Sequence, residues 1–216
     1  ATGTLLVLEA MRRHDVGHVV VASSSSVYGA NPTLPKSEDL VCQPMSPYAV
    51  SKLATESYAL ANAHVYGFGA LAFRFFNVFG PHQRAGHAYA AVIPAFVDAA
   101  LDGKPLPVHG DGTQSRDFTY VGDVCDVITE AVAGRISSDR PVNLAFGGRY
   151  TLLDVIERLA GTMGEPLAVE HQPNRPGDVP HSQADQTRLR SLFPSLEPVD
   201  LDDGLQRTVE WHRSLR

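Results

Sequence analysis

The stretch HVVVASSSS at residues 18–26 points most directly to the architecture of this chain. Its first part, HVVVA, is rich in β-branched residues and lacks the polar alternation of a half-exposed strand. Such a run is typical of a parallel strand that is buried on both faces, and the four serines mark its end. The run ALAFRFF at residues 70–76 has the same character, so we predict a second buried strand there.

The segment between these two strands carries the start and stop signals of a helix at residues 48–66. Ser46 is a favourable N-cap, and Pro47 falls in the first turn, where its missing N–H group is not needed. Gly67 can take the left-handed conformation that ends a helix. A further amphipathic helix is expected at residues 4–13. Helices that alternate with buried strands are typical of an α/β domain with a parallel sheet.

The elements become shorter after residue 103, which indicates a smaller second lobe. Thr151 and Asp154 form a capping-box pattern at the start of one helix in this part of the chain. The remaining strands are predicted at residues 105–108, 116–120, 142–145 and 167–171. The remaining helices are predicted at residues 90–101, 121–133, 151–161 and 200–214.

The composition excludes several classes of protein. The 216 residues are 44% hydrophobic and carry a formal net charge of −6, so there is no general basic field to bind nucleic acid. No apolar run approaches the ~18 residues that a membrane span needs. Cys42 and Cys125 form no C-x-x-C motif, which predicts free thiols in a reducing cytoplasm. The nine histidines show no metal-binding spacing, and no metal is expected.

The strongest local motif is YAVSK at residues 48–52. Tyr48 and Lys52 are four residues apart and therefore share one face of the predicted helix. An ammonium group beside a tyrosine hydroxyl favours the phenolate, which can act as a general base. The pair alone is a weak signal, because a surface lysine that packs its stem against a tyrosine gives the same pattern.

The ends of the two predicted strands strengthen this signal. Serines follow the first strand at residues 23–26, and Asn77 with several aromatic residues follows the second. In an open parallel sheet, ligands bind beyond the carboxyl ends of the strands. We therefore expect the serine hydroxyls, Tyr48, Lys52 and Asn77 to converge on one site.

Further motifs follow in order along the chain, and together they identify a family. They are SSSSVYG at residues 23–29, YAVSK at 48–52, RFFNVFGP at 74–81, RDFTYVGDV at 116–124, and RPGD at 175–178 followed by AD at 184–185. In this combination the chain resembles the extended branch of the short-chain dehydrogenase/reductase superfamily. Within that branch it resembles the NAD-dependent nucleotide-sugar epimerases of the UDP-glucose 4-epimerase type. The resemblance covers essentially all 216 residues.

The resemblance implies roles for the residues near the reacting centre. Tyr48 is similar to the catalytic acid/base, and Lys52 to the lysine that holds the nicotinamide ribose of NAD. Ser24 matches the residue that bridges the sugar 4-hydroxyl and the tyrosine. The other positions that match contacts of the nicotinamide are Ser23, Phe75 and Phe76.

The resemblance also implies a set of substrate contacts. Arg116, Arg175 and Asn77 match residues that bind the diphosphate, which suits arginine because its planar fork pairs with phosphate oxygens. Asp178 matches a carboxylate that binds the uridine ribose. The remaining expected substrate contacts are Ser24, Ser25, Val92, His109 at the uracil position, and Ser182 at the sugar pocket.

The implied fold is a doubly wound, Rossmann-like parallel sheet with a smaller α/β substrate-binding lobe. Residues 1–104 are expected to belong to the NAD-binding domain, to which the strand near residues 142–146 returns, and residues 105–216 mainly to the lobe. The chain contains no G-x-x-G-x-x-G motif. It is therefore expected to be the downstream portion of an epimerase, with an N-terminally incomplete sheet and without tight NAD binding or turnover on its own. The helices at 4–13 and 48–66 match those that pair in the family's homodimer.

The expected reaction is epimerisation at C4 of a UDP-sugar through a transient 4-keto intermediate. A dehydratase or decarboxylase of the same branch is an alternative, although Ser25 and Ser26 stand where dehydratases carry an acidic pair. A non-catalytic fragment is a third possibility. The sugar remains open among glucose/galactose, N-acetylamino and uronate forms, and a dTDP-sugar is not excluded.

Overall fold

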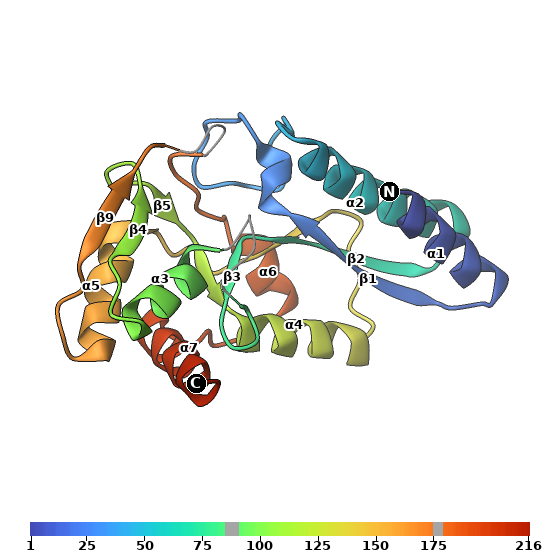
Figure 1. Ribbon diagram of the computed structural model, residues 1–216. Coiled ribbons are helices and arrows are strands. Elements are labelled where there is room, and N and C mark those ends of the chain that lie inside the picture. Colours follow the sequence, from blue (N-terminus) through green and yellow to red (C-terminus); the bar gives the residue numbers. More distant parts are fainter. Residues whose placement is uncertain (85–90, 175–178) are drawn as a thin grey trace. The chain divides into compact units, whose positions relative to one another are not determined.

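The computed structural model describes residues 1–84, 91–174 and 179–216 (Figure 1). The described chain forms two compact units, each built from three separate segments. The first unit consists of Ala1–Phe76, Val124–Gly147 and Ala184–Leu196. The second unit consists of Asn77–Asp123, Gly148–Gln183 and Glu197–Arg216. Neither unit is a continuous half of the sequence.

The first unit contains a three-stranded parallel sheet with the strand order β1-β2-β7. The strands are β1 (His18–Ser24), β2 (Gly69–Phe75) and β7 (Val142–Leu144). The 3-10 helix η1 (Ser25–Tyr28) and helix α2 (Pro47–Tyr66) lie between β1 and β2 in the sequence, and α2 packs on both strands. Helix α1 (Thr2–Arg13) precedes β1 and packs against α2 (Figure 1). The prediction of an α/β fold with parallel strands is confirmed.

Local signals set the ends of the helices that were predicted from the sequence. The Ser46 side chain accepts a hydrogen bond from the Ala49 N–H at 3.1 Å, and Gly67 ends α2 with a φ of 74°. In the second unit, Thr151 and Asp154 form the predicted capping box at the start of α5 (Leu152–Met163). These ends agree with the sequence because each depends on residues within a few positions of one another.

The burial of β1 differs from the prediction. The sequence predicts a strand that is buried on both faces, but only Ser23 is buried and Ala22 is exposed. Within the described residues, β1 pairs with β2 alone. In contrast, β2 lies between two strands and is buried from Ala70 to Arg74. The two strands have similar apolar sequences, but β2 has a paired strand on each side and β1, in the described part of the chain, on one side only. The number of paired strands therefore determines how much of each strand is buried.

The second unit is built from three pairs of short strands and three main helices. The pairs are β3 (Asn77–Phe79) with β6 (Phe118–Tyr120), β4 (Leu106–His109) with β9 (Val169–Gln172), and β5 (Ser115–Arg116) with β8 (Tyr150–Thr151). The helices are α3 (Val92–Leu101), α5 and α7 (Leu201–Ser214). The strand predicted at residues 116–120 is divided at Asp117, because its two halves pair with different partners.

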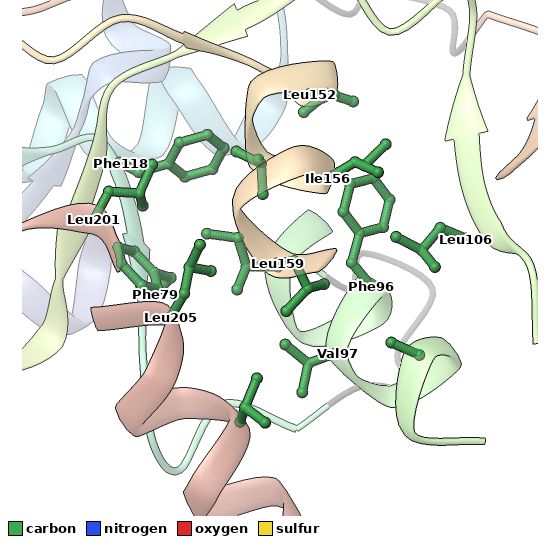
Figure 2. Close-up of a cluster of buried hydrophobic side chains, with 14 of the residues drawn as sticks. Phe79, Phe96, Val97, Leu106, Phe118, Leu152, Ile156, Leu159, Leu201 and Leu205 are labelled. Atoms are coloured by element: carbon green, nitrogen blue, oxygen red, sulfur yellow. The ribbon is translucent and has the colours of Figure 1, made fainter. Parts of the chain in front are cut away.

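An apolar cluster forms the core of the second unit (Figure 2). Phe79 and Phe118 meet edge to face with their ring centroids 6.2 Å apart, and Phe96, Leu159 and Leu205 fill the space between the helices. Burial of such side chains contributes about 1.5–3 kcal/mol each. The elements that were not predicted are η1, β3, β8 and α6 (Thr187–Leu192), because segments of two to six residues carry too little periodicity. Helix α4 (Val121–Ala133) was predicted with the same bounds.

None of the helices in the described ranges combines the length and apolar character of a membrane-crossing segment.

Candidate active site

Helix α2 places Tyr48 and Lys52 at the end of strand β1. Tyr48 lies in the first turn of the helix, and 56% of its surface is exposed. The Lys52 Nζ atom donates a hydrogen bond to the Ala22 carbonyl oxygen at 2.9 Å and lies 5.7 Å from the centroid of the Tyr48 ring. The lysine is thus fixed beside the tyrosine by the strand itself.

The serines at the end of β1 and in η1 form a hydrogen-bonded turn. Ser23 is buried, and its hydroxyl donates to the Lys52 carbonyl oxygen at 3.4 Å. Ser24 Oγ accepts two hydrogen bonds, from the Ser26 N–H at 3.2 Å and from Ser26 Oγ at 2.9 Å. The Ser24 proton is used in neither bond, so it can be donated to an oxygen of a bound molecule. Ser25 is the first residue of η1 and is half-buried.

A close backbone approach holds the end of this turn. Gly29 follows η1 with a φ of 49°, and a Cβ atom there would lie 1.8 Å from the Gln43 carbonyl oxygen. Any residue other than glycine would separate the turn from the loop that contacts it. The turn that carries Ser24 is therefore fixed at both of its ends.

The two aromatic residues that follow Arg74 have different surroundings. Phe75 pairs with Ser24 in the sheet register and is half-buried. Phe76 is buried in a small apolar cluster with Val27 and Tyr28, whose ring centroid lies 6.3 Å away. A contact of either ring with nicotinamide stays a prediction.

The second unit holds the residues predicted to bind the substrate diphosphate. The Arg116 Nη1 group donates to the carbonyl oxygens of Ser115 at 2.9 Å and Pro180 at 3.2 Å. These bonds orient the planar guanidinium group from one side. The Asn77 backbone N–H and its side-chain Nδ2 both donate to the Asp117 carbonyl oxygen, at 3.2 and 3.3 Å. Both side chains are therefore held by main-chain oxygens.

Two further basic side chains contact Ser115, the residue before Arg116, and were not identified from the sequence. Ser115 Oγ lies 2.9 Å from Nδ1 of His181 and accepts a hydrogen bond from Arg149 Nε at 3.2 Å. The pairing of β5 with β8 and a bridge between Ser115 and His181 bring them together. No local pattern could have found them, because 34 and 66 residues separate these two residues from Ser115.

The other predicted substrate contacts are spread over the second unit. His109 ends β4, and its Nδ1 atom lies 3.0 Å from the Pro173 carbonyl oxygen. The Ser182 N–H donates to the Ser115 carbonyl oxygen at 3.0 Å. Val92 is the half-buried first residue of α3. Arg175 and Asp178 lie outside the described residues.

The first unit contains a buried ionic pair that the motifs did not identify as functional. Arg74 on β2 and Glu56 on α2 form a bidentate salt bridge, with Nη2–Oε1 at 2.6 Å and Nε–Oε2 at 3.1 Å. The available signal was the spacing of Glu56, since it follows Lys52 by four residues and Tyr48 by eight on the same helix.

A metal centre is not formed by the described residues, among which no group of three or more His, Cys, Asp or Glu side chains could hold an ion.

Comparison with known proteins places these features in one family. Residues 1–145 match the family described as the NAD dependent epimerase/dehydratase family. The chain is 35% identical over 213 residues to a UDP-glucose 4-epimerase of Mycolicibacterium smegmatis. The aligned region covers 98% of this chain and 67% of that protein. The chain therefore spans about two thirds of the length of such relatives.

Two solved structures are similar over nearly the whole chain. One is a UDP-N-acetylglucosamine 4-epimerase from Methanobrevibacter ruminantium in complex with UDP-N-acetylmuramic acid. Its TM-score is 0.92 at 34% sequence identity, and the aligned region covers 99% of this chain and 68% of that chain. MoeE5 in complex with UDP-glucuronic acid and NAD has a TM-score of 0.88 at 34% identity and covers 100% and 71%. The chain belongs to the NAD-dependent epimerase/dehydratase family.

Proposed function

We propose that the protein epimerises a UDP-sugar at C4 with NAD as cofactor and Tyr48 as the acid/base. The observation that carries this proposal is the placement of Lys52, which is bonded to the end of β1 and lies beside the exposed Tyr48. Similarity to UDP-sugar 4-epimerases supports the choice of reaction. The protein is accordingly an isomerase.

The side chains divide the proton chemistry between them. Tyr48 acts as the general base that removes the proton from the sugar 4-hydroxyl, with the Lys52 ammonium group beside its ring. The Ser24 hydroxyl donates a hydrogen bond to the same sugar oxygen, and this bond keeps the oxygen in line with Tyr48. After the 4-keto sugar has turned over, Tyr48 returns the proton to the oxygen, and C4 is inverted without net oxidation. NAD⁺, when bound, supplies the reversible acceptor for the C4 hydride.

The residues present fit the nicotinamide end of this cofactor. Lys52 uses one of its three donors on Ala22, and the remaining two suit the hydroxyls of a ribose. Tyr48 and Phe75 add a hydroxyl and an aromatic face at the same strand ends, and Ser23 and Phe76 complete the proposed contacts. The sequence has no glycine-rich loop for the pyrophosphate, so this fit concerns the nicotinamide end alone.

The second unit supplies the proposed contacts with the substrate. Arg116, with a guanidinium oriented by two carbonyls, binds the diphosphate together with Asn77 and Arg175. Asp178 binds the uridine ribose, and His109 stacks on the uracil. Ser25 of the first unit, Val92 and Ser182 are further proposed substrate contacts, and Ser182 is the one proposed to limit the size of the sugar. Residues 1–104, with the strand at 142–146, form the proposed NAD-binding domain, and residues 105–216 mainly the substrate lobe.

A homodimer through α1 and α2 is also proposed. The two helices pack against each other, and Thr4 and Thr55 approach with their hydroxyl oxygens 3.1 Å apart. Large apolar side chains remain exposed on both helices, namely Leu6, Val7, Val50, Val65 and Tyr66. Exposed apolar residues concentrated on a helix pair are typical of a protein–protein interface. The composition and the two free thiols favour the cytoplasm as the location.

The proposal is tested by incubating the complete protein and NAD⁺ with a panel of nucleotide sugars. The panel contains UDP-glucose, UDP-N-acetylglucosamine, UDP-glucuronate and dTDP-glucose, and the products are identified by NMR. We expect the C4 epimer of one or more UDP-sugars. A 4-keto-6-deoxy sugar would identify a dehydratase instead, loss of carbon dioxide a decarboxylase, and no product with any sugar would contradict the proposal.

The role of Tyr48 is tested in the same assay with a matched control. Tyr48→Phe removes only the hydroxyl and is expected to lower kcat by about 10²–10⁴-fold. Binding of the UDP-sugar should remain, because the nucleotide contacts lie elsewhere. Tyr58→Phe makes the same change at another exposed tyrosine of α2 and should leave kcat unchanged. Equal activity of the two variants would refute the acid/base role.

A further inference from the structure

The Arg74–Glu56 pair is enclosed almost completely by the first unit. Both side chains are only 4% exposed. Removing two charges from water is costly, and apolar residues of similar volume often stabilise a fold equally well. Stability alone therefore does not explain an ionic pair here. A bidentate salt bridge fixes both the distance between the two side chains and their relative orientation.

Arg74 has a second set of contacts on another side. Its guanidinium carbon lies 4.8 Å from the centroid of the Tyr28 ring. Nη1 donates to the Glu38 carbonyl oxygen at 3.4 Å, and Nη2 donates to Cys42 Sγ at 3.3 Å. The Tyr28 hydroxyl donates to Asn143 Oδ1 at 2.7 Å, so the ring itself is fixed. Arg74 thus contacts α2 through Glu56 and η1 through Tyr28.

Helix α2 carries Tyr48 and Lys52, and η1 begins directly after Ser24; these are the three residues proposed to act at the sugar 4-hydroxyl. Glu56 follows Lys52 by one turn of α2 and Tyr48 by two turns. Tyr28 is the last residue of η1, whose N-cap is Ser24. A shift of α2 along β2 would separate Tyr48 from Ser24, and misplacement by about 1 Å can cost as much as 10²-fold in rate.

We propose that Arg74 and Glu56 are positioning residues, which join helix α2 to the turn Ser25–Tyr28 and so hold Tyr48, Lys52 and Ser24 in register. This inference rests on the proposed function and deepens it. Neither residue is catalytic in this scheme, because both act through the segments that they hold.

Two variants separate positioning from stability. Glu56→Gln keeps the size of the side chain but leaves the Arg74 charge without its partner. The double variant Arg74→Met with Glu56→Leu replaces the pair by apolar side chains, which often preserve the stability of a fold. We expect kcat to fall by about 10- to 100-fold in both variants with KM within about threefold of wild type. The unfolding midpoint should fall only in Glu56→Gln.

A matched control is available at an exposed ion pair of the same unit. Glu9 and Arg12 lie 2.9 Å apart on α1 with side chains 32% and 44% exposed. Glu9→Gln is the same substitution as Glu56→Gln and should change neither kcat nor the unfolding midpoint. A double variant with wild-type kcat would overturn the proposal, since the pair would then serve stability alone.

Hydrogen exchange gives a readout that does not depend on activity. In Glu56→Gln, peptides that cover residues 24–29 and 47–52 should exchange faster together, while those of the second unit keep their wild-type rates. Unchanged exchange in both segments would contradict positioning even if the wild type were inactive on every sugar. Failure of the proposed function and failure of this inference are thereby distinguished.

Discussion

The two units differ in what fills their interiors. The first unit encloses a polar network in which Arg74, Glu56, Tyr28 and Asn143 are all buried. The second unit has a core of aromatic and aliphatic side chains beside buried polar residues such as Asp117 and Asp123, and one of its ion pairs, Arg158–Asp202, is exposed. Arg74 joins the segments that carry Tyr48 and Ser24 through a buried salt bridge and the Tyr28 ring, whereas the ion pairs found among the described residues of the second unit are open to solvent. This difference supports the positioning role proposed for Arg74 and Glu56.

The largest expected effect on stability comes from the packed core of the second unit. Phe96 is fully buried in this cluster. Phe96→Ala should lower the free energy of unfolding by about 3–5 kcal/mol, because it removes apolar contacts and leaves a cavity. Urea denaturation measures this change. Leu153→Ala, at an exposed position of α5, should cost under about 1 kcal/mol. Equal losses in the two variants would contradict a core held by packing.

The polar interior of the first unit should respond to alkaline pH. Burial raises the pKa of Tyr28 to about 12, above its ordinary value near 10. Between these values the unfolded chain loses the Tyr28 proton and the folded chain keeps it, so stability falls as pH rises. The loss from this group amounts to about 2–3 kcal/mol between pH ~10 and ~12.

The variant Tyr28→Phe isolates this contribution. It lacks the ionisable group and should show a shallower fall of stability over the same pH range, measured by denaturation at each pH. Its stability at pH 7 should be lower, because Asn143 loses its hydrogen-bond donor. A wild-type pH dependence in this variant would show that Tyr28 is not the group responsible.

The smallest expected effect concerns a helix end in the second unit. Thr151→Ala removes the side chain that accepts from the Asp154 N–H at 3.0 Å and should cost about 1 kcal/mol. Thr151→Ser keeps the hydroxyl and should recover most of this loss in the same denaturation experiment. If serine fails to recover it, the lost methyl contacts matter more than the cap.

Local signals predicted much of the fold. Ser46, Gly67 and the pair Thr151–Asp154 determine the ends of helices through contacts over three or four residues. The burial of β1 and the break at Asp117 were not predictable, because both depend on which strands lie alongside. Sequence patterns describe a segment, whereas neighbours are a property of the folded chain.

The candidate site shows the same limit. The spacing of Tyr48 and Lys52, together with the end of β1, was sufficient to predict that these groups lie together. The salt bridge between Glu56 on α2 and Arg74 on β2 was missed, because its two residues are 18 positions apart in the sequence. Arg149 and His181 were also missed, since only long-range pairing brings them to Ser115.

The most direct test of C4 epimerisation with Tyr48 as the acid/base is an NMR measurement in D₂O. The complete protein is incubated with NAD⁺ and with the UDP-sugar that gives the highest activity, and the C4 position is observed over time. We predict that wild type forms the C4 epimer with hydrogen, not deuterium, on C4, while Tyr48→Phe forms almost none. Deuterium on C4, or rapid epimerisation by Tyr48→Phe, would contradict the mechanism.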